Sequence, residues 1–455
     1  MRSSASNLNF VKAQTVPNLV IAPVGANGKV ALYNGSAGTV QLIGDVSGWF
    51  TGAPAALAVG FTTLVSAQDD GMELPGYSQP GAVSSGGRYV AFSSSAALPG
   101  APQGGAFRRD TANGVTTLIA ADDIGVFFSP VGITADGNHV LVSTYNDLGS
   151  DSYFSAAVRD LAAGTTHLLN VTADNVEGDG TSEAMALSAD GRYAVFTSNS
   201  TNLTPVSTDG SWYIYQRDLQ LGTTALIGKC GTVNGCWPWG DVSSDGRFVV
   251  YAEDLAGTYV QQVKLWDRAA GTTVLVSATT SGTPGNDQSL SPSVSDDGSL
   301  VAFFSTATNL VANDTNGESD VFVRNVAKGI TTLVTRAPSG QQANGASQDA
   351  TISGDGVYIV FASNSTNLPT SGPITNPVGR DEVYGRNLAT GVTTLLSTDP
   401  NGAPGNGDAD SPVGFGSWSP ILSRDGSAVT YSSNANNIVP NTSFGPTNVL
   451  MRRLK

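Results

Sequence analysis

Short runs of apolar residues, each preceded by a polar turn, recur along the chain about every fifty residues. Six of the turns read Ser/Thr-x-Asp-Gly, and the first has Gly86 in place of the aspartate. The Asp-Gly pair favours a tight hairpin, because glycine accepts a positive φ and aspartate bonds to its own backbone. The turn glycines are Gly87, Gly137, Gly191, Gly246, Gly298, Gly356 and Gly426, which lie 50, 54, 55, 52, 58 and 70 residues apart.

Each repeat has the pattern of four short strands. In the fifth repeat the predicted strands are residues 291–295, 300–304, 320–324 and 331–334. A period near fifty with several strands per unit is typical of propeller blades, whereas helical repeats of this length would not carry so much Thr, Val and Gly. The repeats therefore predict an all-β chain.

A second pattern, Gly-x-Thr-Thr-Leu, predicts how the repeats close. It is clearest at residues 114–118 and 391–395, and one copy, at 60–66, precedes the first turn. No copy follows the last predicted strand, residues 449–453. Because one blade cannot bury its own faces, the stack must close on itself. We therefore predict a seven-bladed β-propeller of four-stranded antiparallel blades, with residues 61–66 as the outer strand of the last blade.

These motifs resemble the repeats of TolB-like (WD-type) β-propellers, which are common in bacterial secreted proteins. The residues that carry the resemblance are Ser-x-Asp-Gly-Arg-Tyr-x-x-Phe-x-Ser, then Asp-x-Phe-Val-Arg-Asp/Asn, then Gly-x-Thr-Thr-Leu, over residues 60 to 455. The resemblance implies a fold but no reaction, since propellers host unrelated activities.

The composition of the chain limits the classes of partner that it can bind. The net charge of −15 disfavours nucleic acid and anionic membrane surfaces, because the field of the protein repels phosphate. No run of eighteen apolar residues is present, so the sequence predicts no membrane insertion. Only 13% of residues are charged and 54 are Gly, which agrees with a turn-rich β protein.

The N-terminal segment differs from the repeats. Residues 1–50 resemble the C-terminal end of a β-rich module of actinobacterial secreted proteins, through residues 16–21, 28–34 and 40–43. Residues 51–59 read as a linker, and 60–455 as the propeller. The first residues lack the apolar stretch of a signal peptide. We expect that the chain begins within this module, that an export signal lies upstream, and that the protein is secreted or displayed at the cell surface.

Two cysteines support an oxidising compartment. Cys230 and Cys236 lie six residues apart in a loop with Gly and Asn between them, so a local disulfide is easy to close. The alternative is two free thiols. A zinc site is disfavoured because no histidine lies nearby in sequence.

The longest connections fall on one face. In four-stranded antiparallel blades the turns between strands a and b and between c and d share one face, here called the turn face. The b–c and d–a connections share the other, here called the long-loop face, and they include residues 121–131, 171–184, 228–240, 363–381 and 398–418. Loops on a rigid scaffold commonly carry binding, so we place the function there.

Aromatic residues on these loops are the candidate ligand contacts. Exposed rings beside Asn, Asp and Ser can stack on sugars or anchor a protein partner, and the alternative is packing between blades. The candidates chosen are Trp212, Trp237, Trp239 and Trp418.

One loop has the oxygen donors of a Ca²⁺ site. Asp314, Asn316 and Asp320 alternate around Gly317, as a hard cation requires, but the later bidentate Glu of an EF-hand is missing. Asx-rich turns also form without metal. No other cofactor is expected.

Signs of catalysis are few. Neither His139, in a ring position of the repeat, nor His167 has a neighbouring nucleophile, and no Gly-x-Ser-x-Gly elbow occurs. The recurring Arg-Asp or Arg-Asn at the end of strand c is interpreted as structural. Our first hypothesis is a non-catalytic extracellular propeller that binds a protein or glycan through its long-loop face. The alternative is a polysaccharide-degrading enzyme that uses carboxylates in the central channel.

Overall fold

The structure is a computed structural model. It describes residues 59–121, 130–146, 153–206, 208–231, 239–255, 258, 260–369, 380–407, 417–440, 442–443 and 447–455. All of them belong to the unit Ala53–Lys455, and the unit Met1–Gly52 lies outside the described part. The predicted module at residues 1–50 and the linker at 51–59 therefore stay predictions.

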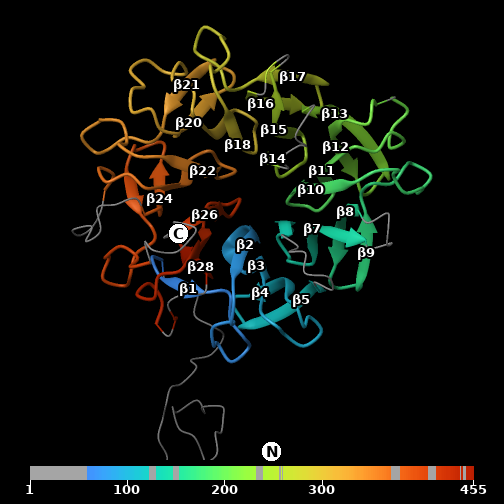
Figure 1. Cartoon of the computed structure of the whole chain (residues 1–455), viewed down its shortest axis with the longest axis horizontal. Coiled ribbons are helices and arrows are strands. Elements are labelled where there is room, and N and C mark those ends of the chain that lie inside the picture. Colours follow the sequence, from blue (N-terminus) through green and yellow to red (C-terminus); the bar gives the residue numbers. More distant parts are fainter. Residues whose placement is uncertain are drawn as a thin grey trace, which may run out of the picture. The chain divides into compact units, whose positions relative to one another are not determined.

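Seven four-stranded antiparallel sheets form the described part, as predicted. The sheets radiate from a central axis, and the first strand of each lies nearest that axis (Figure 1). Blades 1 and 2 contain β2 (Ser78–Val83), β3 (Tyr89–Ser94), β4 (Gly105–Asp110), β5 (Val115–Ala121), β6 (Pro130–Ile133), β7 (His139–Asn146), β8 (Tyr153–Asp160) and β9 (Thr165–Leu168). Blades 3 and 4 contain β10 (Ser182–Leu187), β11 (Tyr193–Ser198), β12 (Trp212–Asp218), β13 (Thr223–Gly231), β14 (Gly240–Val242), β15 (Phe248–Asp254), β16 (Gln261–Asp267) and β17 (Thr272–Leu275).

The remaining blades follow the same order. Blades 5 and 6 contain β18 (Ser289–Val294), β19 (Leu300–Ser305), β20 (Asp320–Asn325), β21 (Ile330–Leu333), β22 (Ser347–Ile352), β23 (Tyr358–Ser363), β24 (Glu382–Asn387) and β25 (Thr393–Leu395). Blade 7 contains β26 (Ser417–Leu422), β27 (Ala428–Ser433), β28 (Asn448–Arg453) and, as its outer strand, β1 (Thr62–Leu64). The predicted closure is confirmed, with Thr63 opposite Met451. One 3-10 turn, Ser85–Gly87, is present, and no described helix is long and apolar enough to cross a membrane.

The core lies between neighbouring blades. Among the described residues, seven clusters of buried side chains each join one blade to the next. Aromatic pairs from strands b and c add to them, such as Phe196 with Tyr215, whose ring centroids are 5.5 Å apart. The blades therefore stabilise one another, since every cluster among the described residues is shared by two blades.

The Asp-Gly turns pack one blade onto the next. At Gly246, φ is +72°, and a Cβ would lie 2.1 Å from the ring of Tyr193 in the preceding blade, so only glycine fits. Ser243 Oγ donates to Asp245 Oδ1 (2.7 Å) and accepts from the Phe248 N–H (2.9 Å), which closes the turn. The spacing of Ser or Thr, Asp and Gly in six of the seven repeats thus has a steric and a hydrogen-bonding cause.

Candidate functional site

Five of the d–a connections on the long-loop face form the same small hairpin. Each is joined by one isolated bridge, as between Ala278 and Pro284. In that copy the Thr279 N–H donates to the Thr283 carbonyl and the Gly285 N–H to the Ser277 carbonyl. The five hairpins span residues 66–74, 170–178, 277–285, 335–343 and 397–405. These loops therefore share one architecture and are less variable than their sequences suggest.

Reciprocal asparagine clasps fix four of these hairpins to the b–c loop of the following blade. In blade 5, Asn309 Oδ1 accepts from the Asn286 N–H (3.0 Å), and Asn309 Nδ2 donates to the Pro284 carbonyl (3.0 Å). Asn286 Oδ1 in turn accepts from the Thr308 N–H (2.9 Å). Equivalent clasps join Asp179 with Asn202, Asn344 with Asn367, and Asn406 with Asn437.

The clasps were missed in the sequence, although a signal is present. Four b–c loops carry (Ser/Ala)-(Thr/Asn)-Asn-(Leu/Ile), at residues 200–203, 307–310, 365–368 and 435–438. The final apolar residue is buried in each copy. The motif thus anchors the loop to the core at one position and clasps the hairpin at the position before it.

The candidate tryptophans do not form one described cluster. Trp239 is 39% exposed and directly precedes β14, the innermost strand of blade 4, so it lies at the long-loop end of the channel. Trp212 is only partly buried and packs against the core cluster between blades 3 and 4. Trp237 lies outside the described residues, as does the side chain of Trp418 in β26. Trp239 is the candidate whose exposure suits a ligand contact.

The proposed Ca²⁺ ligands do come together, within a hydrogen-bond network. Gln342 Nε2 donates to Asp314 Oδ1 and to Asp320 Oδ2, both at 2.7 Å, and Asn316 Nδ2 donates to Asp320 Oδ2 (2.9 Å). Burial raises the pKa of Asp320, and hydrogen bonds from Thr335, Asn316 and Gln342 counteract it. Ligation of Ca²⁺ would require both amides to turn their oxygens towards the ion, so the metal site stays a prediction.

The disulfide also stays a prediction. Cys230 is fully buried at the end of β13, in the core cluster between blades 3 and 4. Cys236 lies outside the described residues.

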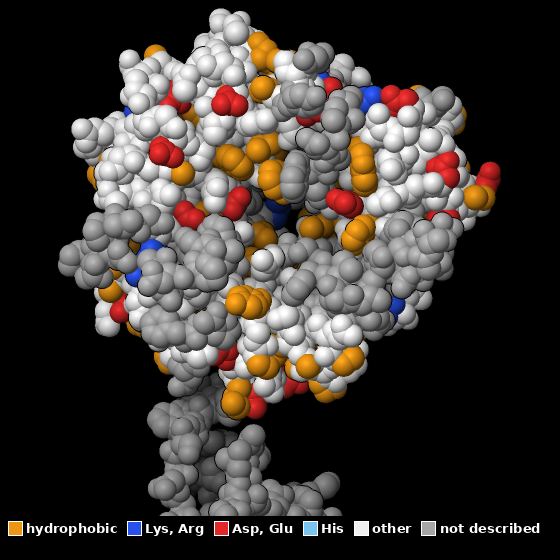
Figure 2. Space-filling view, viewed as in Figure 1, with side chains coloured by type: hydrophobic (Ala, Val, Ile, Leu, Met, Phe, Trp, Pro, Cys, Tyr) orange, Lys and Arg blue, Asp and Glu red, His pale blue; other side chains and the backbone are white. Residues whose placement is uncertain are grey.

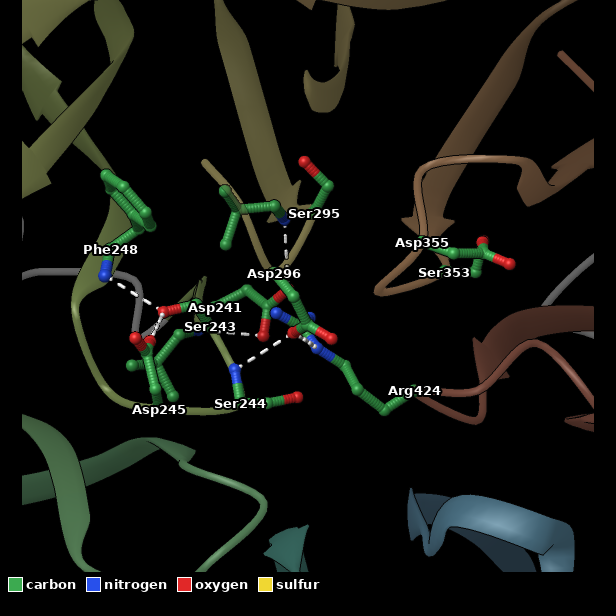
Figure 3. Close-up of polar contacts among 12 residues, drawn as sticks. Asp241, Ser243, Ser244, Asp245, Phe248, Ser295, Asp296, Ser353, Asp355 and Arg424 are labelled. Atoms are coloured by element: carbon green, nitrogen blue, oxygen red, sulfur yellow. Dashed lines mark hydrogen bonds and ion pairs between the residues drawn. The ribbon is translucent and has the colours of Figure 1, made fainter. Parts of the chain in front are cut away.

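An arginine spans the turn-face end of the central channel. Arg424 Nη1 lies 3.0 Å from Asp241 Oδ2 and Arg424 Nε lies 2.7 Å from Asp296 Oδ1. These residues come from blades 7, 4 and 5, and the arginine reaches from its turn across the axis (Figure 3). Figure 2 shows Lys or Arg atoms at the bottom of the central opening, with apolar and acidic side chains around its rim. Gly354 leaves room for the Asp296 carboxylate, because a Cβ at residue 354 would lie 2.2 Å from Asp296 Oδ2.

The electrostatics of this bridge are mutually supporting. Burial pushes the pKa of Arg424 down, but Asp241 and Asp296 outweigh it and raise that pKa. Burial pushes the pKa of Asp296 up, but Arg424 and Ser244 lower it overall. Arg424 and Asp296 are therefore charged at neutral pH, and the bridge joins blades 4, 5 and 7.

A second group of carboxyls lies in blade 6. Burial raises the pKa of Asp349, which accepts a hydrogen bond from the Ser419 backbone N–H. Burial and the neighbouring Asp349 together raise the pKa of Asp381 to about 6. Burial raises the pKa of Glu382 to about 8, and Ser397 donates to its Oε2. With its pKa at about 8, Glu382 can hold a proton at neutral pH, which is what a general acid needs.

The Arg-Asp pairs of strand c are structural, as interpreted from the sequence. Asp218 Oδ1 accepts from the Gln220 and Leu221 N–H groups, both at 3.0 Å, and so caps the c–d turn. Arg217 Nη1 donates to Thr224 Oγ1 in the adjacent strand (2.9 Å) and to the Val171 carbonyl of the preceding hairpin (2.8 Å).

The histidines offer no described nucleophile pair. His139 is partly buried, as Tyr89 and Phe248 are at the same position of their repeats, and its Nε2 lies 3.6 Å from Asp160 Oδ2. His167 is exposed and shares a hydrogen bond with Thr165 (3.2 Å).

Comparison with solved structures supports the fold. An oligogalacturonate lyase in complex with manganese is 11% identical, with a TM-score of 0.52, and the match covers 88% of this chain and 94% of the lyase. The β-propeller domain of the Trilobed protease from Pyrococcus furiosus is 11% identical, with a TM-score of 0.50, over 84% of this chain and 98% of that domain. TolB from Acinetobacter baumannii is 14% identical, with a TM-score of 0.40, over 81% and 80% of the two chains.

At these identities the likeness shows the fold alone. The propeller implied by the TolB-like resemblance is thereby confirmed. No family model matches the sequence, and no curated protein matches it. The Trilobed protease domain is described as having an open velcro topology, whereas here β1 completes the blade that contains β28.

Proposed function

We propose that the protein is a non-catalytic binding propeller, secreted or displayed at the cell surface, that holds a protein or glycan on its long-loop face. The observation that carries the proposal is the set of asparagine clasps, because loops held in one arrangement lose little conformational entropy when a ligand binds. Trp239 adds an exposed ring at the mouth of the channel on the same face.

The arrangement at the opposite end agrees with this proposal. Arg424, Asp241 and Asp296 neutralise most of one another's charge, so the carboxylates at the turn face are engaged in a structural tie. A ligand would therefore meet the channel from the long-loop face. The negative net charge favours a neutral or basic partner over nucleic acid.

A thermal-shift screen tests the proposal. Purified protein is heated with Ca²⁺, with EDTA, and with a panel of cell-wall and plant oligosaccharides. A ligand that binds only the folded state raises Tm by mass action. A shift with a glycan that is reduced in Trp239→Ala supports the long-loop face, while a glycan shift that is the same in Trp239→Ala counts against this location. A shift with Ca²⁺ alone that disappears in Asp314→Asn supports the metal site.

An enzymatic function is the second candidate, because of the blade 6 carboxyls. Asp381, with its raised pKa beside Asp349, could serve as a proton donor or acceptor towards a sugar. One protein of the same fold is an oligogalacturonate lyase. Incubation with oligogalacturonate and other plant oligosaccharides, followed by mass spectrometry, tests this. Turnover that is lost in Asp381→Asn but kept in Trp239→Ala would replace the binding proposal.

A further inference from the structure

The connection between blades 1 and 2 is shorter than the five connections that form a hairpin at this place elsewhere in the propeller. β5 continues to Ala121, and eight residues, 122–129, lead to β6, whereas thirteen residues, such as 276–288, separate β17 from β18. β13 is extended in the same way, to Gly231. The five outer strands that precede a hairpin all end at a leucine: Leu64, Leu168, Leu275, Leu333 and Leu395.

In three of the hairpin-bearing positions an arginine holds a backbone carbonyl of the hairpin. Arg324 Nη1 donates to the Ala278 carbonyl (2.9 Å) and to Thr331 Oγ1 (2.9 Å), and Thr331 Oγ1 donates to the same Ala278 carbonyl (2.6 Å). Arg109 with Thr116 binds the Ala67 carbonyl in the same way, and Arg217 binds the carbonyl of Val171. The bound residue is a small apolar one in each case.

Blades 2 and 4, which follow the longer outer strands β5 and β13, differ at the arginine. Blade 4 has lost it: Trp266, buried at 9% exposure, stands in its place before Asp267. Blade 2 has kept it as Arg159, together with the matching Thr166. Within the part of the chain that the structure describes, Arg159 Nη1 donates to the Gly164 carbonyl (3.0 Å) and Thr166 Oγ1 (2.9 Å), both in its own blade, and its buried Nε has no partner.

A cleft of about 360 Å³ lies at this position. It lies between the outer strand of blade 1 and the outer strands of blade 2, which are neighbours in Figure 1. Its walls are apolar apart from the arginine and the threonine. The lining residues are Leu118, Ile119, Ala120, Ala121, Val142, Arg159 and Thr166.

We propose that this cleft is a peptide-binding site on the rim of the propeller. Its occupant is a turn or extended segment of a partner protein that carries a small apolar residue, whose backbone carbonyl accepts from Arg159 and Thr166. The evidence for this chemistry comes from the chain itself. In blades 1 and 5 the equivalent arginine and threonine bind the backbone carbonyl of a hairpin alanine. β5 is also the last strand of its sheet, and an unpaired strand edge can accept a further strand.

A peptide copied from one of the chain's own hairpins can be used to test the cleft. A synthetic peptide with the sequence of residues 276–285, acetylated and amidated at its ends, is titrated into the full-length protein by calorimetry. We expect saturable one-to-one binding. Arg159→Gln should weaken it about tenfold or more, since a hydrogen bond from a charged donor is lost. Ala120→Trp should abolish binding by filling the cleft, while Arg88→Gln, an exposed arginine on another turn, should leave it unchanged.

Other outcomes overturn the proposal. One is the absence of saturable binding up to millimolar peptide. Another is equal binding by the wild type, Arg159→Gln and Ala120→Trp. Equal Tm values for the variants show that the cleft, rather than the fold, has been changed. Trp239→Ala should not affect this peptide, so the rim site and the long-loop face are tested separately.

Discussion

At the scale of single residues, the arginine near the end of strand c connects three parts of the molecule. Arg324 is 7% exposed and donates to the adjacent strand through Thr331 and to the preceding hairpin through the Ala278 and Thr279 carbonyls. Burial lowers the pKa of Arg324, yet arginine stays charged at any ordinary pH. A buried charge of this kind is held by its hydrogen bonds, so it should be sensitive to substitution.

We therefore expect Arg324→Gln to lower the free energy of unfolding by about 2 kcal/mol, because several hydrogen bonds from a charged donor are lost. Urea unfolding followed by tryptophan fluorescence measures the change. Arg88→Gln is the matched control: the Arg88 side chain is 52% exposed and pairs with Asp110, so its loss should destabilise the protein clearly less than the loss of Arg324. Equal effects in the two variants would contradict a special role for the hairpin contacts.

Glu382 predicts how stability depends on pH. Its folded pKa, about 8, lies above the ordinary value of 4.5, because burial outweighs the contributions of Ser397 and Arg380. The folded state therefore binds more protons than the unfolded state between these values, and stability falls as pH rises through this window. Asp381, raised to about 6, acts in the same direction over a narrower range.

We expect Tm of the wild type to fall between pH 5 and pH 8.5, and that of Glu382→Gln to fall less, since a neutral amide cannot release the proton. Differential scanning calorimetry across this range measures both slopes. Asp209→Asn is the control, because its carboxyl is exposed and hydrogen bonds from Lys229 and Ser211 lower its pKa far below this window. A Glu382→Gln slope equal to that of the wild type would refute the assignment.

At the scale of elements, the asparagine clasps join loops that are distant in sequence. Asn286 and Asn309 are 23 residues apart, and their backbone and side-chain bonds close a ring between a hairpin and a b–c loop. We expect Asn309→Ala to increase hydrogen exchange of the Thr279 and Gly282 amides, because the hairpin loses its outer support. The cost to global stability should be about 1–2 kcal/mol.

Hydrogen exchange followed by mass spectrometry on residues 277–285 measures the effect. Asn138→Ala is the control, since Asn138 bonds to Asp136 within an exposed turn on the other face. If both variants leave the exchange of the hairpin unchanged, the clasp does not hold the loop, and the argument for a preorganised long-loop face loses its basis.

The sequence predicted the parts of the fold that repeat and are local. The Asp-Gly turns and Gly-x-Thr-Thr-Leu strands have causes within a few residues, such as the bonds of Ser243 to Asp245 and Phe248. The bridge from Arg424 to Asp241 joins residues 183 apart in sequence and occurs once, so no repeated sequence pattern could predict it. The Arg-Asp pairs were read correctly as structural, because repetition in almost every blade favours a structural role. Arg159 keeps the sequence pattern, yet its described Nη1 bonds stay within its own blade, which no repeat of the sequence indicates.

At the scale of the whole molecule, β1 holds the two ends of the ring together. The Gly60 N–H donates to the Arg453 carbonyl (2.8 Å), the Val65 N–H donates to the Val449 carbonyl (2.8 Å), and Ser66 Oγ donates to Asn448 Oδ1 (2.9 Å). Val65 is fully buried in the cluster between blades 7 and 1. Without these residues β28 would present an unpaired edge, and such edges pair with other chains.

Two truncations that differ only in residues 59–66 test this closure. A chain that begins at Val59 should melt close to the full-length protein, because it keeps β1 and the closing contacts of Gly60, Val65 and Ser66. A chain that begins at Ala67 should melt about 5 °C lower or more, as expected for a loss of a few kcal/mol in a domain of this size. It should also self-associate through β28, which light scattering after gel filtration detects. A monomeric Ala67 chain with unchanged Tm would mean that the ring stays closed without residues 59–66. The inter-blade clusters alone would then keep blades 7 and 1 together.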